Sequence, residues 1–191
     1  WNSDVCSSDL AMFARAKRSI LHATTAMEGH PDNVAASLYG GVTASASGEV
    51  VRLPLGCDPA IVAWVPETQT STEKSRTTIP PQIALGDVIF NIGHTALVMG
   101  ALASGDTAVM RTAFTDRLHQ DVRLAAAPSS KNALEAALST SAWAAWLSGS
   151  GPTIAVMCAK ADAASISSAL PADGVTHVLA IDADGAVITV E

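Results

Sequence analysis

The chain has 191 residues, of which 49% are hydrophobic and 15% charged, and its formal net charge is −7. This composition is enough for one or two compact domains, and the acidic balance argues against the basic surface that nucleic acid phosphates require. Gly, His, Asp or Ser interrupts the longest apolar runs, and no basic segment precedes an apolar one at the start. We therefore expect a cytoplasmic protein that binds neither nucleic acid nor a membrane.

The cysteines and histidines predict neither a disulfide framework nor a transition-metal site. The three cysteines, Cys6, Cys57 and Cys158, are odd in number and far apart, and no two of the five histidines stand four residues apart. Disulfide-rich domains and helical zinc sites need the opposite pattern. We expect reduced thiols, two of them in apolar strands.

The first ten residues, WNSDVCSSDL, differ in kind from the rest of the chain. They are rich in Ser and Asp, show no periodicity, and resemble translated sequencing-adapter sequence more than protein. We therefore treat residues 1–10 as an artefactual leader and leave them out of the functional argument.

A regular pattern of helices and strands is predicted from residue 11 on. Apolar side chains return at helical spacing over 11–27, and Pro31 suits the first position of a helix over 31–39 that Gly40 and Gly41 end. Further helices are predicted at 84–103, 107–118, 129–141 and 162–170, and strands within 42–55, 60–67, 145–159 and 176–191, the last pair around an Asp184–Gly185 turn. Helices and hairpins mixed in this order predict an α+β sandwich.

The stretch EGHPDN (28–33) places polar groups at the start of the second predicted helix. Unpaired N–H groups at a helix N-terminus attract phosphate or carboxylate, whereas the side chains of Glu28 and Asp32 suit a hard cation such as Mg²⁺. The spacing also fits a purely structural role, in which Asp32 is a favourable first-turn acid and His30 or Glu28 caps the helix.

The stretch TSTEKSR (70–76) sets Arg76 one helical turn beyond Thr72. A hydroxyl and a guanidinium on one helix face can grip a carboxylate or a phosphate. The alternative is a helix N-cap followed by a solvated arginine.

The stretch DRLHQDVR (116–123) contains an acid, an imidazole and a guanidinium at regular intervals. If the segment is helical, the side chains of Asp116, His119 and Arg123 face one way. The alternative is a solvated charged face.

The stretch SGSGP (148–152) lies between two apolar runs. Residues without bulk allow a ligand or another backbone to come close. The alternative is a plain hairpin turn.

These four stretches, in this order along the chain, resemble the homoserine kinase branch of the GHMP small-molecule kinases. EGHPDNVAASLYGG is close to a signature of that branch, STEKSR and DRLHQDVR are moderately specific, and LSGSGPT is shared by the wider superfamily. The resemblance runs from about residue 11 to the C-terminus. It implies the GHMP kinase fold, with the remnant of an N-terminal domain at 11–56 and a ferredoxin-like C-terminal domain at 57–191.

The resemblance implies an enzyme that moves the γ-phosphate of ATP to the side-chain hydroxyl of L-homoserine, on the route to threonine. Glu28 would help to hold Mg²⁺, and Arg76 and Arg123 would clamp the substrate carboxylate in bidentate pairs. The other implied substrate-binding residues are Asp32, Asn33, Thr72 and Gly149, and the implied ATP-binding residues are Ser148, Gly149, Ser150 and Gly151. A homodimer is implied by the resemblance only.

The resemblance also implies that Asn33 and Arg123 act in catalysis. Some GHMP relatives have an Asp base where Asn33 stands here, and an Asn side chain cannot take a proton. Catalysis would then rest on positioning and charge neutralisation, on which phosphoryl transfer largely depends.

One departure from the family pattern concerns ATP. GHMP kinases carry, ahead of the region matched here, a Gly-Leu-Gly-Ser-Ser-Ala-Ala loop whose backbone N–H groups cradle the phosphates. This sequence does not contain it. We therefore expect an N-terminally truncated chain that cannot bind ATP productively.

Two other functions remain open at this point. One is a GHMP kinase that acts on a different small alcohol. The other is a non-catalytic, ferredoxin-like module that binds an amino acid without phosphorylating it.

Overall fold

A computed structural model describes residues 7–67, 80 and 82–187, with side chains from residue 13 on. The chain divides into two compact units, residues 1–54 with 181–191 and residues 55–180, and each is described by itself. The division lies close to the domain boundary predicted after residue 56. The sequence predicts the C-terminal segment in the second domain, whereas the structure groups its described part with the first unit.

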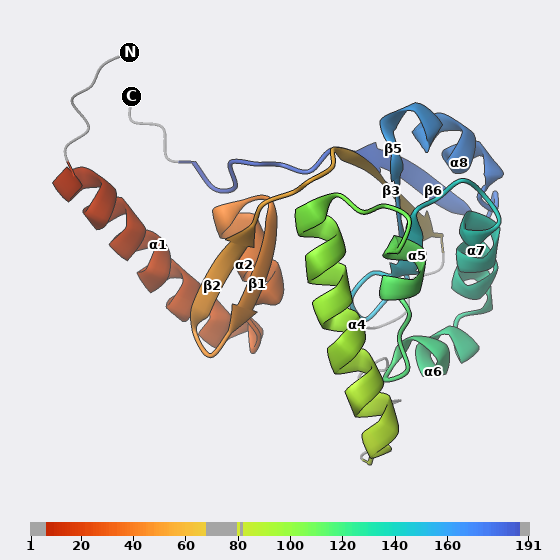
Figure 1. Cartoon of the computed structure of the whole chain (residues 1–191), viewed down its shortest axis with the longest axis horizontal. Coiled ribbons are helices and arrows are strands. Elements are labelled where there is room, and N and C mark those ends of the chain that lie inside the picture. The colour runs from red at the N-terminus through yellow and green to blue at the C-terminus, as the bar shows by residue number, and fades with distance from the viewer. Residues whose placement is uncertain (1–6, 68–79, 81, 188–191) are drawn as a thin grey trace. The chain divides into compact units, whose positions relative to one another are not determined.

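The first unit consists of two helices and a hairpin (Figure 1). Its elements are α1 (Ser7–Glu28), α2 (Asp32–Tyr39), β1 (Val42–Ala46) and β2 (Glu49–Leu53). Both predicted helices and both strands are confirmed, although α1 begins inside the WNSDVCSSDL stretch and Pro31 is the N-cap of α2 rather than its first residue. The side chains of Leu21, Ala35 and Leu38 form the small core of this unit.

The C-terminal segment packs against the end of α2 instead of forming the predicted hairpin. Gly40 has a φ of +69°, and a Cβ there would meet the backbone of Gly185 and Ala183 at 2.5 and 2.7 Å, so only glycine fits this close approach. Arg52 Nη2 donates to the carbonyl of Ala183 at 2.9 Å. The first strand of the pair predicted over 176–191 is confirmed, because a strand covers Gly174–Leu179, but no strand follows it as far as residue 187, where Gly185 of the Asp-Gly dipeptide contacts the end of α2. Residues 188–191 lie outside the described residues.

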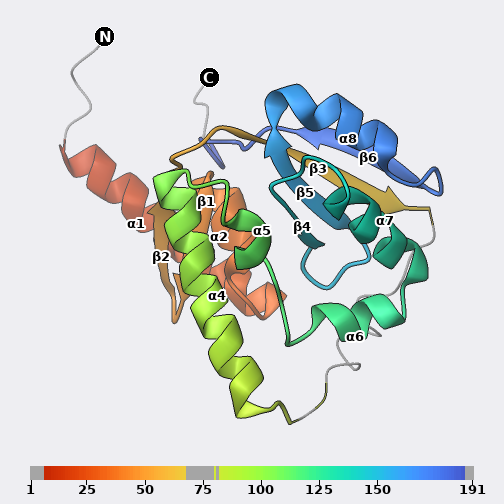
Figure 2. The same cartoon turned by 45° about the vertical axis from the view of Figure 1, so that its right-hand side comes forward.

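The second unit is a four-stranded antiparallel sheet with helices on both faces (Figures 1 and 2). Its elements are β3 (Pro59–Pro66), α4 (Leu85–Ser104), α5 (Met110–Ala113), α6 (Gln120–Ala125), α7 (Pro128–Leu138), β4 (Ala144–Leu147), β5 (Ile154–Ala159), a 3₁₀ turn (Lys160–Asp162), α8 (Ala163–Ala169) and β6 (Gly174–Leu179). The strand order is β4-β5-β3-β6, and neighbouring strands are antiparallel. This order is the ferredoxin-like arrangement, and the predicted α+β class is confirmed.

The main core lies between this sheet and the helices α7 and α8. Alternate side chains of β3, among them Val62 and Trp64, point into it and are fully buried. Trp64 Nε1 donates to the carbonyl of Pro171 at 2.9 Å, so the polar atom of this buried ring is satisfied. On the opposite face, the ring of Phe114, which follows α5, contacts Trp146 of β4 with 4.5 Å between ring centroids.

The helix predicted over 107–118 is wrong in most of its length. Only Met110–Ala113 form α5, and residues 114–119 are a turn that leads into α6. The reason is Asp116, whose carboxylate accepts hydrogen bonds from backbone N–H groups at the start of α6. A side chain that satisfies those N–H groups starts a new helix instead of continuing the old one.

α4 is the one helix in the described part of the chain that is long and apolar enough to cross a membrane, judged by length and composition alone. Asn91, one of its polar residues, contacts protein: Nδ2 donates to Asp116 Oδ1 at 2.7 Å, and Oδ1 accepts from the backbone N–H of Arg117 at 2.9 Å. Length and composition by themselves are weak evidence for a membrane span. The bonds of Asn91 identify a face of α4 that packs against the turn before α6.

Candidate active site

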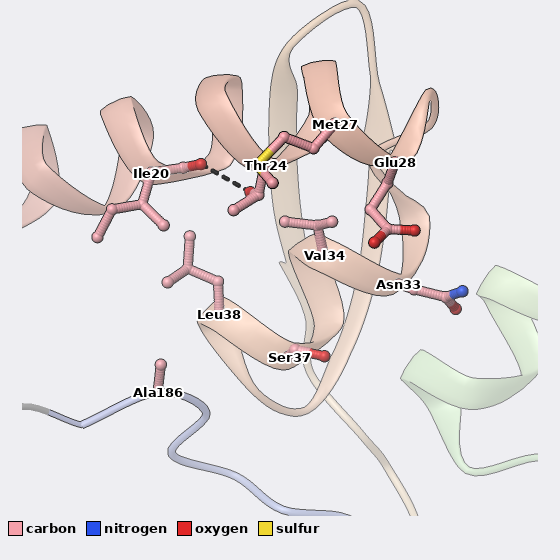
Figure 3. Close-up of a pocket in the computed structure, with 9 residues that line it drawn as sticks. All are labelled: Ile20, Thr24, Met27, Glu28, Asn33, Val34, Ser37, Leu38 and Ala186. Atoms are coloured by element: carbon pink, nitrogen blue, oxygen red, sulfur yellow. Dashed lines mark hydrogen bonds between the residues drawn. The ribbon is translucent and has the colours of Figure 1, made fainter.

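In the first unit, a cavity of about 470 Å³ opens beside the end of α1 and the start of α2 (Figure 3). It is lined by Ile20, Thr24, Met27, Glu28, Asn33, Val34, Ser37, Leu38 and Ala186. Glu28 is the last residue of α1 and Asn33 lies in the first turn of α2, so the short Gly-His-Pro link between the helices brings a carboxylate and an amide to one cavity. The structure thus places two of the predicted site residues, Glu28 and Asn33, at the wall of the same cavity.

Asp32 does not line this cavity. Its carboxylate is 73% exposed and pairs with His30, with 2.8 Å between His30 Nδ1 and Asp32 Oδ1. The N-cap of α2 is Pro31, whose side chain makes no capping hydrogen bond. Asp32 stands in the first turn, where an acid is favourable, as the structural alternative for this motif expects, and capping by His30 or Glu28 stays a prediction.

Glu28 fits the role of a magnesium ligand by its chemistry. The described residues contain no group of three or more His, Cys, Asp or Glu that could hold a metal ion. Mg²⁺ is commonly bound by one or two carboxylates together with substrate phosphates and water, so a single exposed carboxylate is a sufficient protein contribution. Glu28 is exposed at the cavity wall and has this character.

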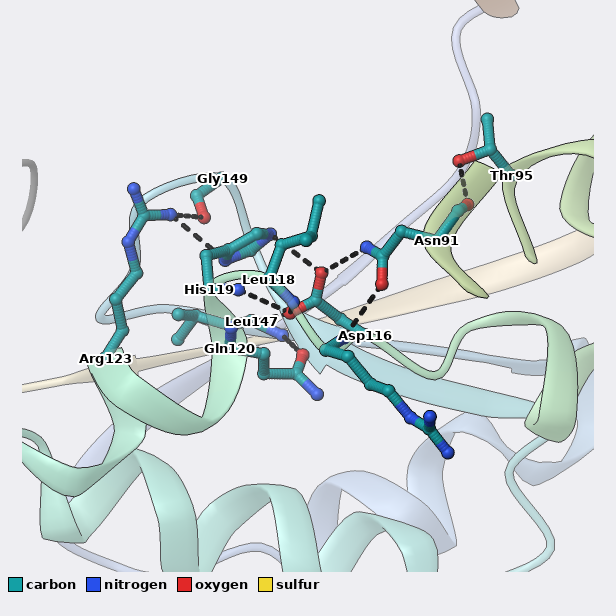
Figure 4. Close-up of polar contacts among 10 residues, drawn as sticks. Asn91, Thr95, Asp116, Leu118, His119, Gln120, Arg123, Leu147 and Gly149 are labelled. Carbon is teal, nitrogen blue, oxygen red and sulfur yellow. Dashed lines mark hydrogen bonds and ion pairs between the residues drawn. The ribbon is translucent and has the colours of Figure 1, made fainter. Parts of the chain in front are cut away.

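In the second unit, the turn before α6 is organised by the carboxylate of Asp116 (Figure 4). Asp116 Oδ2 accepts from the backbone N–H groups of Leu118, His119 and Gln120 at 3.0, 2.8 and 2.7 Å. Asp116 Oδ1 accepts from Asn91 of α4. The side chain is only 14% exposed, so the predicted alternative of a solvated charged face is wrong for this residue.

The side chains of Asp116, His119 and Arg123 meet, although not through one helix face as predicted. His119 Nε2 lies 3.7 Å from Asp116 Oδ1, and Arg123 Nη1 donates to His119 Nδ1 at 3.1 Å. Arg123 Nη1 also donates to the carbonyl of Gly149 at 3.1 Å. A continuous set of contacts therefore runs from Asp116 through His119 and Arg123 to the glycine-containing turn, as Figure 4 shows.

The network shifts the pKa values of two of its members. Burial alone would raise the pKa of Asp116, but the hydrogen bonds from the backbone of Gln120 and His119 and from Asn91, with the nearby imidazole, lower it below its ordinary value. Burial lowers the pKa of His119, and so does the charge of Arg123, although Asp116 acts in the opposite direction. At neutral pH the network consists of a carboxylate, a neutral imidazole and a guanidinium.

Replacing Asp116 by Ala is expected to lower the free energy of unfolding by about 2 to 3 kcal/mol, because three backbone N–H groups and Asn91 lose a charged acceptor. Since the pKa of Asp116 is lowered on folding, this stabilisation is present above its ordinary value and is lost as the pH falls below about 4. Urea unfolding of both proteins near neutral pH and under acid measures the two effects.

Asp121 provides the matched control, because it is an exposed acid in the first turn of the same helix. Asp121→Ala is expected to cost less than about 1 kcal/mol. If both substitutions lowered the free energy of unfolding by the same amount, Asp116 would stabilise the protein through its charge alone and not through its hydrogen bonds.

The turn at 148–152 is held in place by side chains from α6 and α7. Besides the bond from Arg123, Gln120 Oε1 accepts from the backbone N–H of Leu147 at 2.8 Å, and the buried hydroxyl of Ser130 donates to the carbonyl of Pro152 at 2.6 Å. Gly149 has a φ of +55°, and a Cβ there would meet nothing within 4 Å, so its backbone is open to an approaching group. This openness is what a phosphate-contacting turn requires.

Sequence reasoning missed three residues of this arrangement, Asn91, Gln120 and Ser130. Gln120 lies inside the DRLHQDVR motif, and Ser130 follows Pro128, the first residue of α7, so both stand at helix starts where polar side chains often bond the backbone. Asn91 is a polar residue between apolar neighbours in a mostly apolar helix, which is a signal that it has a polar partner. Thr72 and Arg76 lie outside the described residues, and the roles predicted for them stay predictions.

Comparison with known proteins gives the family. The family model described as "GHMP kinases C terminal" matches residues 98–176, a range that includes both the turn before α6 and the turn at 148–152. The chain is 35% identical to the homoserine kinase of Desulfitobacterium hafniense over 96% of this chain and 66% of that protein. The chain belongs to the GHMP kinase family.

Further homoserine kinases agree with this assignment. The chain is 40% identical to that of Moorella thermoacetica over 73% of this chain and 48% of that protein. The crystal structure of homoserine kinase from Cytophaga hutchinsonii superposes with a TM-score of 0.77 at 26% identity, covering 82% of this chain and 53% of that one. The predicted GHMP kinase family and fold are confirmed, and the chain spans about half to two thirds of the length of these relatives.

Proposed function

We propose that this GHMP kinase chain serves in the ATP-dependent phosphorylation of the side-chain hydroxyl of L-homoserine to O-phospho-L-homoserine. The observation that carries the proposal is the contact of Arg123 with Gly149, which joins a cation suited to an amino-acid carboxylate to a turn with an open backbone. The similarity to proteins named homoserine kinase supports the same substrate.

Arg123 has donors left for a ligand. Its Nη1 is used by Gly149 and His119, whereas its Nε is buried and has no acceptor among the described residues. The covered Nε is out of a ligand's reach, whereas Nη2 makes no hydrogen bond that the structure describes and is the donor left for a carboxylate, the acceptor that a guanidinium binds best. The substrate carboxylate is therefore assigned to Arg123, with Arg76 as the second arginine and Thr72 beside it.

The roles in the first unit follow from its cavity. Asn33 at the cavity wall orients the amino acid through its amide, with Asp32 next to it, and acts by position because an amide does not take a proton at neutral pH. Glu28 is the residue that holds Mg²⁺. ATP supplies the transferred phosphoryl group, and the metal ion neutralises the charge on its oxygens.

The ATP phosphates are assigned to the turn at Ser148, Gly149, Ser150 and Gly151. Because the sequence holds no Gly-Leu-Gly-Ser-Ser-Ala-Ala loop, the proposal includes that these 191 residues transfer no phosphate by themselves. We further propose a cytoplasmic location, a homodimer, and no binding to nucleic acid or membranes.

Isothermal titration calorimetry of the chain with L-homoserine tests the proposed substrate. We expect saturable binding of L-homoserine and none of mevalonate, an alcohol of similar size without an amino group. Binding of mevalonate but not of L-homoserine would assign the chain to a different GHMP kinase. An ADP-release assay with ATP, Mg²⁺ and L-homoserine tests the second expectation, which turnover by the 191-residue chain would contradict.

A further inference from the structure

The contact between Arg123 and His119 fixes where the imidazole proton lies. A guanidinium only donates hydrogen bonds, so Arg123 Nη1 at 3.1 Å from His119 Nδ1 requires a lone pair on Nδ1. In a neutral ring the proton is then on Nε2, the nitrogen that lies 3.7 Å from Asp116 Oδ1. Nδ1 therefore faces a hydrogen-bond donor, and the protonated Nε2 faces a negatively charged carboxylate.

Asp116 is a firm support for that ring. Its carboxylate is held by three backbone N–H groups and by Asn91 of α4, so it cannot turn away without breaking several bonds. The negative charge near Nε2 favours the tautomer with the proton on that nitrogen. At 3.7 Å the carboxylate of Asp116 makes no hydrogen bond to His119 Nε2, and it acts on the ring through its negative charge.

His119 in turn limits the freedom of Arg123. With Nη1 shared between His119 Nδ1 and the Gly149 carbonyl, the guanidinium plane has two fixed acceptors on one side, and its remaining donors point elsewhere. A doubly protonated ring would present a donor to a donor and a positive charge to a positive charge. Arg123 would then lose one of its two acceptors.

We propose that His119 is a positioning residue, whose neutral imidazole accepts a hydrogen bond from Arg123, keeps it in place beside Gly149 and so makes carboxylate binding depend on the protonation of His119. The inference rests on the proposed function in assigning the substrate carboxylate to Arg123. His119 acts through Arg123 and is not assigned any contact with substrate.

The expected pH dependence follows from the groups around His119. The charged groups that face it are Asp116 from the turn and Arg123 from α6, while the nearby Arg117 pairs with Asp87 of α4 at 3.9 Å. Burial and Arg123 lower the pKa of His119 below its ordinary value, so the ring is neutral at neutral pH. Binding of L-homoserine is expected to weaken as the pH falls through this lowered pKa.

Two substitutions separate positioning from mere packing. His119→Asn keeps an acceptor close to the place of Nδ1 and does not titrate, so it is expected to bind L-homoserine as the parent does near neutral pH and to lose the acid-dependent weakening. His119→Ala removes the acceptor and is expected to weaken binding about five- to tenfold throughout. His177→Asn, at an exposed position of β6, is the control and is expected to keep the parent profile.

The experiment combines calorimetry with L-homoserine between about pH 5 and 8 with nitrogen-15 NMR of the histidine rings in the same proteins. We expect NMR to show His119 with a proton on Nε2 and none on Nδ1 near neutral pH. A proton on Nδ1 there, or His119→Ala binding as tightly as the parent, would overturn the inference. If L-homoserine bound to none of the proteins, the proposed function would fall, and the NMR tautomer would still decide whether His119 holds Arg123.

Discussion

Arg123→Ala is expected to weaken binding of L-homoserine about ten- to a hundredfold, the largest effect on ligand binding that the structure predicts. The substitution leaves the substrate carboxylate without a charged donor, and such bonds contribute about 1.5 to 3 kcal/mol. It also removes the bond to Gly149 and the donor to His119. Calorimetry with L-homoserine, with the folded fraction checked by circular dichroism, measures the change in Kd.

Arg123→Lys distinguishes the shape of the guanidinium from its charge. A lysine ammonium is a single donor centre that cannot reach two protein acceptors and a carboxylate with the same geometry, so we expect most of the affinity to be lost as well. Arg117→Ala is the matched control, because this exposed arginine stacks on Phe90, 3.8 Å from the ring centroid, and belongs to no assigned contact of the substrate. Equal Kd values for Arg123→Ala and Arg117→Ala would remove Arg123 from the site.

The strands of the second unit could be predicted because their sequences allow little else. β3 and β5 are continuous apolar runs bounded by Pro, Gly and small residues, and such short runs are recognised as strands without strict alternation, although only β5 is buried on both faces. The order of those strands in the sheet could not be predicted from the sequence, because it depends on pairing between strands that are far apart in the chain. β3 pairs with both β5 and β6, which follow it by roughly 90 to 120 residues in the chain.

The turn before α6 shows why periodicity alone failed at the candidate site. The spacing of Asp116, His119 and Arg123 is helical, and the three side chains do come together, but a carboxylate that accepts three backbone N–H groups interrupts the helix between them. Helical spacing does not distinguish a continuous helix from a capped start. The partner that fixes Asp116 from outside, Asn91, is 25 residues away in sequence and gives no local signal.

The hairpin turn predicted at the Asp-Gly dipeptide near the C-terminus is wrong for a related reason. Asp-Gly between apolar residues is a strong hairpin signal, but it reports only that the backbone can adopt a positive φ. Gly185 does so, with a φ of +65°, and uses it to pass close to Gly40 at the end of α2. A local signal for a turn does not say what the turn packs against.

Trp64→Ala is expected to lower the free energy of unfolding by about 3 to 5 kcal/mol, the largest effect on stability that the structure predicts. Trp64 is fully buried in β3, the strand that pairs with both β5 and β6. A Cβ at Gly174 would collide with its ring, which shows how closely the backbone of β6 packs on it. Because small domains are stable by only about 5 to 15 kcal/mol, such a loss is a large share of the total.

Trp64→Phe separates the ring from its hydrogen bond. Phenylalanine fills most of the same space but has no N–H, so the carbonyl of Pro171 loses its donor and we expect a smaller cost of about 1 to 3 kcal/mol. Urea unfolding followed by far-ultraviolet circular dichroism ranks the free energies of unfolding of the parent and the two variants.

Trp146, only partly buried in β4, is the control position. Trp146→Phe is expected to lower the free energy of unfolding less than either change at Trp64, since it removes no hydrogen bond that the structure describes. Equal stability of Trp64→Phe and the parent would show that the Pro171 carbonyl finds another donor, and that packing against Gly174 alone accounts for the tryptophan.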